Sequence, residues 1–127
     1  MPPTILVVDD DPDIRHILAE ALTESGYAVE EAGDGIAALQ RIAVRVPDLI
    51  LADVRMPRLD GMGLATLLAP HSPPIPLILM SANSLPQECS LPFIRKPFDF
   101  DALLTMMART LPVSAVSTVA LIGLGAT

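Results

Sequence analysis

The sequence predicts an α/β protein in which helices cover both faces of a parallel sheet. Short apolar segments alternate five times with segments of helical periodicity along the 127 residues. The segments at residues 5–8, 49–52 and 77–80 are hydrophobic throughout. Such continuous hydrophobicity is typical of strands buried on both faces, and its alternation with helices is typical of a parallel sheet.

The first strand is expected at residues 4–8, followed by a helix. Asp11 is a capping side chain and Pro12 suits the first helical position. The following apolar residues recur with the period of an amphipathic helix: Ile14, Ile17, Leu18, Ala21 and Leu22. Ser25-Gly26 is a typical helix end.

The next expected elements are an edge strand at residues 27–31 and a second helix. This helix opens at Asp34 and ends before Pro47. Its expected apolar face consists of Leu39, Ile42 and Ala43. The third strand, residues 49–52, ends on Asp53.

The second half of the chain continues the alternation. A third helix is expected at residues 60–69, with an inward face formed by Leu64, Leu67 and Leu68. A buried strand at 77–80 and a short strand at 93–95 follow. Asp99 is expected to cap a last helix that ends near residue 109. The apolar side of this helix consists of Phe100, Leu103, Met107 and Leu111.

The composition excludes several function classes. A net charge of −7, 3% aromatic residues and the absence of Trp argue against direct binding of nucleic acid. The single cysteine, Cys89, cannot form an internal disulfide, which favours a reducing compartment. The uncharged run at residues 113–126 is shorter than the ~20 residues of a membrane helix. We therefore expect a cytoplasmic protein without a membrane segment.

Four polar residues each follow the carboxyl end of an expected strand. They are Asp9, Asp53, Ser81 and Lys96, the last being the only lysine in the chain. In an open parallel sheet these strand ends share one edge, where ligands bind at the point of strand reversal. We therefore expect the four side chains to converge, together with Asp10.

These residue types suit phosphoryl chemistry. Converging carboxylates bind Mg²⁺, which prefers one or two carboxylates with water and a phosphate oxygen. A carboxylate can also act as the nucleophile toward phosphorus and form an aspartyl phosphate. A hydroxyl and an ammonium group on neighbouring strands would then hold the phosphoryl oxygens. Both are supplied here, by Ser81 and Lys96.

Four stretches resemble the receiver domain of bacterial two-component response regulators, a CheY-like superfamily. They are Ile5-Leu6-Val7-Val8-Asp9-Asp10-Asp11, Asp53-Val54-Arg55-Met56-Pro57-Arg58-Leu59-Asp60-Gly61, Met80-Ser81-Ala82 and Lys96-Pro97-Phe98. The resemblance covers about residues 3–111. It implies a flavodoxin-like (βα)5 fold with strand order 2-1-3-4-5.

The resemblance also implies roles for particular residues. Asp53 would accept a phosphoryl group from a sensor histidine kinase or a histidine phosphotransfer protein. Asp10 and Asp53 would bind Mg²⁺ directly, Arg55 through its backbone carbonyl, and Asp9 through water. Ser81 and Lys96 would contact the phosphoryl group.

The resemblance further implies that Phe93 stands at the aromatic switch position and that Lys96-Pro97 is a cis bond. Phosphorylation would then switch the face formed by the fourth and fifth strands. Self-phosphorylation and autodephosphorylation would be the only catalysis, so we do not expect a metabolic enzyme.

Two features depart from the family pattern. Only 15 positions separate Ser81 from Lys96, which leaves room for a shortened fourth helix between residues 83 and 92. The expected domain limits are 1–111 for the receiver and 112–127 for an apolar tail or linker. The tail could pack over the surface that a full fourth helix would cover.

Two other functions remain open. One is a docking or dimerisation receiver that is not controlled by phosphorylation, and a homodimer is compatible with either receiver function. The other is a small Mg²⁺-dependent phosphotransferase with an aspartyl-phosphate intermediate. That enzyme would normally carry a second acid two residues after the nucleophile, where this chain has Arg55.

Overall fold

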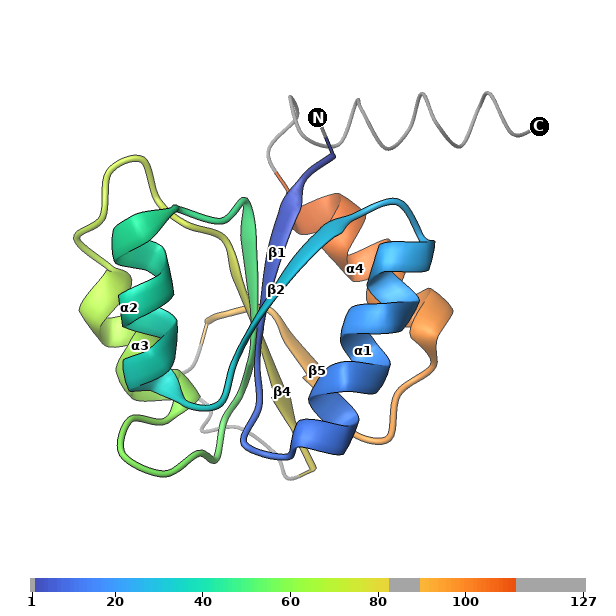
Figure 1. Cartoon of the computed structure of the whole chain (residues 1–127), viewed down its shortest axis with the longest axis horizontal. Helices are drawn as coiled ribbons and strands as arrows, with labels where there is room; N and C mark the ends of the chain where they lie inside the picture. The colour runs from blue at the N-terminus through green and yellow to red at the C-terminus, as the bar shows by residue number, and fades with distance from the viewer. Residues whose placement is uncertain (1, 83–89, 112–127) are drawn as a thin grey trace.

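A five-stranded parallel sheet lies between two layers of helices in the computed structural model (Figure 1). The structure describes residues 2–82 and 90–111. The strands are β1 (Thr4–Val8), β2 (Ala28–Ala32), β3 (Leu49–Asp53), β4 (Leu77–Ser81) and β5 (Phe93–Arg95). The helices are α1 (Pro12–Glu24), α2 (Gly35–Val44), α3 (Gly61–Leu68) and α4 (Phe100–Thr110). The strand order β2-β1-β3-β4-β5 confirms the predicted flavodoxin-like topology.

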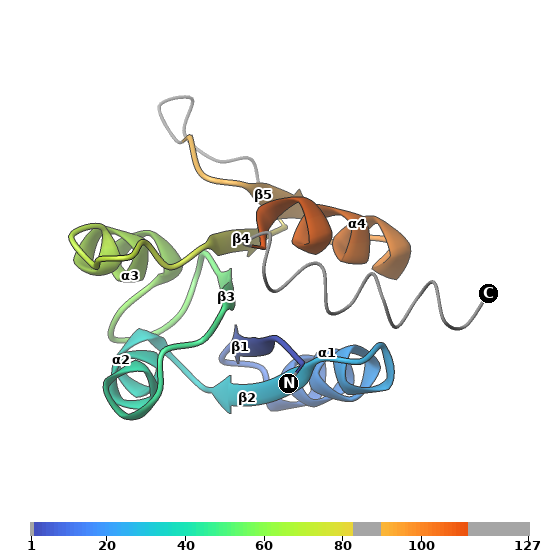
Figure 2. The same ribbon diagram turned by 90° about the horizontal axis from the view of Figure 1, so that it is seen from above.

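The two helical layers bury alternate residues of the same strands. Helices α1 and α4 cover one face of the sheet, and α2 and α3 cover the other (Figure 2). In β1, Ile5 and Val7 join the core beneath α1 and α4, whereas Leu6 and Val8 join the core beneath α2 and α3. All four are fully buried, and burial of such a side chain stabilises the fold by about 1.5–3 kcal/mol. The apolar strands are therefore explained by a sheet with two cores.

Aspartates cap all four described helices, as the sequence pattern predicted for three of them. Asp11 accepts the N–H groups of Asp13 and Ile14, and Asp99 accepts that of Asp101. Asp34 and Asp60 cap α2 and α3. Because these caps satisfy amide groups that a helix leaves unpaired, the helices begin where the sequence places them.

Some predicted boundaries and faces differ from the structure. Strand β2 begins and ends one residue later than expected, at Ala28 and Ala32. On α1, Ile14 and Ile17 are 40% and 66% exposed, although the helical pattern placed them on the apolar face with the core residues. Leu67, predicted to face inward, is 58% exposed, and Ala43 is also exposed. On α1, α2 and α3 the sheet thus covers a narrower stripe of the helix than the apolar pattern spans.

The shortened fourth helix and the C-terminal tail lie largely or wholly outside the described residues. Residues 83–89 carry most of the expected fourth helix, and the described residues 90–92 that follow are not helical. Within the described ranges, no helix is both long enough and apolar enough to cross a membrane.

An ion pair joins the start of α2 to the loop after β3. The Asp34 carboxylate accepts the Arg58 Nε–H at 2.7 Å and also contacts Arg58 Nη2, while one of its oxygens caps the Ala37 N–H at 2.8 Å. The Ala37 amide and the Arg58 guanidinium hold the pKa of Asp34 below its ordinary value of 3.8. Gly35 completes this junction, because its N–H donates to the Leu59 carbonyl and a Cβ there would meet that oxygen at 2.5 Å.

The lowered pKa of Asp34 predicts a measurable pH dependence. The unfolded chain binds the proton of this carboxyl more tightly than the folded protein does. The Ala37 cap and the Arg58 ion pair of Asp34 therefore stabilise the fold above its unfolded pKa of about 4, and this stabilisation is lost as the pH falls through the folded pKa. In urea unfolding, Asp34→Asn should be less stable than the wild type at pH 7, with the difference shrinking on acidification. Asp99→Asn, at another cap, is the control. A difference that stays constant with pH would contradict the assignment.

Candidate functional site

The carboxyl ends of the central strands bring the predicted residues to one edge of the sheet. Asp9 follows β1, Asp53 ends β3, and β3 pairs directly with both β1 and β4. Ser81 ends β4, and its carbonyl oxygen accepts the Lys96 backbone N–H at 2.8 Å. The four positions therefore lie together, as the parallel arrangement of strands requires.

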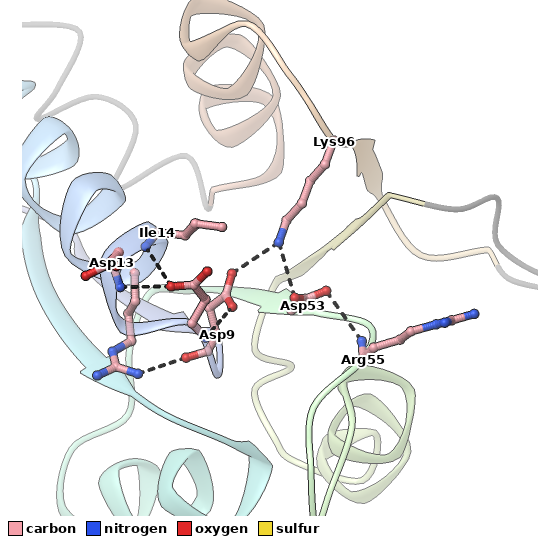
Figure 3. A network of polar contacts seen from close by, with 8 residues as sticks. Asp9, Asp13, Ile14, Asp53, Arg55 and Lys96 are labelled. Atoms are coloured by element: carbon pink, nitrogen blue, oxygen red, sulfur yellow. Dashed lines mark hydrogen bonds and ion pairs between the residues drawn. The ribbon is translucent and has the colours of Figure 1, made fainter.

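Lys96 connects two of the carboxylates. Its Nζ lies 3.2 Å from Asp9 Oδ2 and 3.2 Å from Asp53 Oδ2 (Figure 3). The Asp9 side chain is 1% exposed and that of Asp53 is 15% exposed, so both acids are largely removed from water. A single ammonium group thus forms ion pairs with two largely buried carboxylates.

The charges of this cluster shift the pKa values of two groups. Burial raises the pKa of Asp53 and the nearby Asp9 charge adds to this, and together they outweigh the lowering effect of Lys96. Burial alone would lower the pKa of Lys96, but attraction to Asp9 and Asp53 raises it overall. Lys96 therefore stays charged, whereas the buried Asp53 carboxylate is less well stabilised and would be favoured by a further cation.

Three carboxylates are placed so that they could hold such a cation. Asp9, Asp10 and Asp53 each offer one oxygen, and these oxygens lie within 4.8 Å of one another. Asp9 is buried and Asp10 is exposed, so the cluster opens to solvent on one side. An all-oxygen donor set of this kind suits a hard divalent cation.

The backbone around Asp9 is held by several contacts. Its Oδ1 accepts the Asp11 N–H at 3.0 Å, and its own N–H donates to the Ala32 carbonyl at 3.2 Å. Its carbonyl oxygen accepts Arg15 Nη1 at 2.9 Å. No local pattern of the sequence identifies Arg15, because its partners become neighbours only through folding.

The segment after Asp53 folds back closely beneath the strand end. The Gly61 N–H donates to the Val54 carbonyl at 3.1 Å. A Cβ at Gly61 would lie 2.5 Å from the Asp53 carbonyl oxygen, so only glycine fits here. The Arg55 N–H lies 3.4 Å from Asp53 Oδ1. The role of the Arg55 carbonyl as a metal ligand stays a prediction.

Ser81 and Phe93 lie on the two strands next to this cluster. Ser81 is 4% exposed at the end of β4. Phe93 pairs with Leu79 and packs, partly buried, on the side of α2 and α3. The Lys96–Pro97 peptide bond is cis, as predicted. The switching roles of Ser81 and Phe93 stay predictions.

A largely apolar depression of about 450 Å³ lies beside Lys96. It is lined by Ile14, Ile17, Leu18, Ala82, Lys96, Pro97, Phe98 and Phe100. Exposed apolar side chains gathered in this way are typical of binding surfaces. This depression could have been suspected from the sequence, because the apolar stripe of α1 is wider than the part of the helix that packs on the sheet.

Comparisons with known proteins agree with this geometry. The profile of the response regulator receiver domain matches residues 5–108. The response regulator MprA of Mycobacterium sp. (strain KMS) is 37% identical over 118 residues, covering 87% of this chain and 51% of the relative. Against other curated relatives the chain spans as little as 24% of their length. The chain thus corresponds to one part of these longer regulators.

Solved receiver structures share the fold. The signal receiver domain of a signal transduction histidine kinase from Syntrophus aciditrophicus superimposes with a TM-score of 0.79 at 34% identity, covering 86% of this chain and 89% of that one. The receiver domain of the sensor histidine kinase PA1611 from Pseudomonas aeruginosa PAO1, solved with magnesium coordinated in its active-site cleft, gives 0.78 at 27% identity, with 87% and 98% covered. The chain therefore belongs to the response regulator receiver domain family, whose members accept the phosphoryl signal of histidine kinases in two-component systems.

Proposed function

We propose that Asp53 is the phosphoacceptor, and that Asp9, Asp10, Asp53 and the Arg55 carbonyl hold Mg²⁺. The observation that carries this proposal is the convergence of three carboxylates and Lys96 at one sheet edge. When bound, Mg²⁺ would neutralise negative charge on the phosphoryl oxygens. The PA1611 receiver, whose active-site cleft coordinates magnesium, supports this choice of cation.

The Asp53 side chain would supply the nucleophile. As a bond forms between its carboxylate oxygen and phosphorus, the bond between phosphorus and the donor atom breaks. Lys96, now 3.2 Å from Asp53 Oδ2, would then pair with a phosphoryl oxygen. Ser81, at the end of the neighbouring strand, would contact the phosphoryl group, and Phe93 would change its packing with it. The outcome is a population shift between two states of the β4–β5 side.

The partner of this reaction would be a sensor histidine kinase or a phosphotransfer protein. The depression that includes Ile14, Ile17 and Phe98 lies beside Lys96, so a partner seated on it would bring its phosphohistidine to Asp53. We propose that catalysis is limited to self-phosphorylation and autodephosphorylation, in the cytoplasm where such kinases use ATP. This chain has a net charge of −7, so we do not propose that it contacts nucleic acid directly.

We further propose that residues 112–127 form an apolar tail outside the receiver unit of residues 1–111. The last described residues of α4 border a groove of about 280 Å³, lined by Thr110, Leu91, Pro92, Ile75 and neighbouring residues. Thr110, which lines this groove, lies two residues before residue 112, and residues 112–127 include no charged residue. The groove is therefore a suitable place for the tail to bury apolar surface.

The phosphoacceptor proposal predicts a single modified aspartate. After incubation with acetyl phosphate and Mg²⁺, the wild type and the control Asp101→Asn should each gain one phosphoryl group by intact mass. Asp53→Asn should gain none, because its amide cannot attack phosphorus. A phosphoryl group on Asp53→Asn would refute the assignment, and an unmodified wild type would favour the phosphorylation-independent docking function.

The docking surface predicts a difference between phosphodonors. Ile17→Glu places a charge on the apolar depression and should slow transfer from a phosphorylated kinase about tenfold, equivalent to ~1.4 kcal/mol of docking energy. Its phosphorylation by acetyl phosphate should be unchanged, because Ile17 does not contact the carboxylates. Val44→Glu, at a position 90% exposed on α2, is the matched control. Equal transfer rates for both variants and the wild type would count against this surface.

The tail proposal predicts a loss of stability on truncation. Deletion of residues 112–127 should lower the melting temperature by several degrees, because apolar surface on the groove returns to water. Differential scanning calorimetry of both chains gives the comparison. An unchanged melting temperature would show that the tail acts as a linker.

A further inference from the structure

Arg15 joins three elements beneath the acidic cluster. From α1, its Nη1 donates to the Asp9 carbonyl oxygen at 2.9 Å and its Nε donates to Glu31 Oε1 on β2 at 3.1 Å. Its side chain is 18% exposed, so most of it is removed from water. A Cβ at Gly33 would lie 3.5 Å from Nη1, which places the guanidinium against the connection from β2 to α2.

The carbonyl that Arg15 contacts belongs to the peptide between two proposed metal-binding residues. A peptide unit is rigid and planar, so the direction of the Asp9 carbonyl also fixes the direction in which Asp10 leaves the strand. The preceding peptide is fixed as well, since the Asp9 N–H donates to the Ala32 carbonyl. Arg15 therefore acts on the relative placement of the two carboxylates without touching either of them.

Glu31 in turn orients the guanidinium. It stands on β2 opposite Val7 of β1, so it is anchored to the sheet two residues before Asp9. Its Oε1 also lies 2.8 Å from His16 Nδ1, on the next residue of α1. The guanidinium of arginine is planar, so its donors to the carboxylate and to the carbonyl are held in fixed directions, whereas the ammonium group of lysine is a point charge on a flexible stem.

We propose that Arg15, oriented by Glu31, is a positioning residue for the divalent-cation site. It sets the peptide between Asp9 and Asp10, and through it the geometry of cation binding. This inference rests on the proposed function, because it takes Asp9 and Asp10 as cation ligands.

The direction in which Mg²⁺ affinity changes on replacement of Arg15 distinguishes a positioning role from a purely electrostatic one. Arg15 is a cation close to a cation site, so its removal should tighten Mg²⁺ binding if only Coulomb repulsion mattered. Loss of positioning should weaken binding instead. Outer contacts that orient metal ligands typically contribute 10–100-fold in affinity, so a loss of about tenfold is expected.

The experiment is calorimetric titration of the full chain with Mg²⁺. Arg15→Gln should bind about tenfold more weakly than the wild type, while Arg109→Gln, which removes the same charge from an exposed position of α4, should bind at least as tightly as the wild type. Arg15→Lys keeps the charge without the fork and should also be weakened. Wild-type affinity in Arg15→Gln would overturn the inference, and so would wild-type affinity in Arg15→Lys.

Variants of Glu31 test whether this carboxylate and Arg15 act together. Glu31→Gln should weaken Mg²⁺ binding, and the double variant should lose no more than Arg15→Gln alone, because the two side chains act as a unit. Additive losses would overturn the pairing. If circular dichroism shows that Arg15→Gln does not fold, unchanged Mg²⁺ affinity in Glu31→Gln overturns the inference.

The variant Asp10→Asn tests the metal site itself. A wild type that binds Mg²⁺ no better than Asp10→Asn would refute the metal site, and this result is distinct from failure of the positioning role.

Discussion

The ion pairs of Lys96 are the interaction on which the functional edge of the sheet depends. Asp9 and Asp53 lie on adjacent strands with little water around either side chain, and two acids in such a place repel each other. The ammonium group lies 3.2 Å from an oxygen of each. The ammonium group reduces the repulsion between the two carboxylates when no cation is bound. Because one positive charge faces two negative ones, negative charge remains that would attract a cation.

The sequence was most informative about where strands end. Continuous apolar runs identified three buried strands, and the polar residue after each run identified Asp9, Asp53 and Ser81, while Lys96 was identified by its place after the short strand at 93–95. It was less informative about helix surfaces. Ile14 and Ile17 fit an amphipathic pattern as well as Leu18 does, yet they are exposed. Hydrophobic periodicity reports that a residue avoids water, and it does not distinguish a core from a surface that a partner covers.

The residues that support the site could not be predicted from the sequence, because their partners are distant. Arg15 meets Glu31 across 16 positions, and Arg58 meets Asp34 across 24. No local motif specifies such pairs. They nevertheless constrain the backbone around the carboxylates: Arg15 from the side of β1, and the junction of Arg58 and Gly35 from the side of the loop after β3. These contacts hold the β1–β3 side of the site, which is consistent with the proposal that a rearrangement would take place on the side of β4 and β5.

The position of Lys96 in the chain also has a kinetic consequence. This side chain lies 87 residues from Asp9 and 43 from Asp53, and it directly follows β5, the last strand along the described residues. Contacts between such distant residues form only after the intervening chain has folded, and they contribute to a high contact order. A nascent or partly unfolded chain therefore has Asp53, the proposed acceptor, without its counter-ion. If Asp53 is the phosphoacceptor, the complete site would form late in folding, because it requires β5 to have joined the sheet.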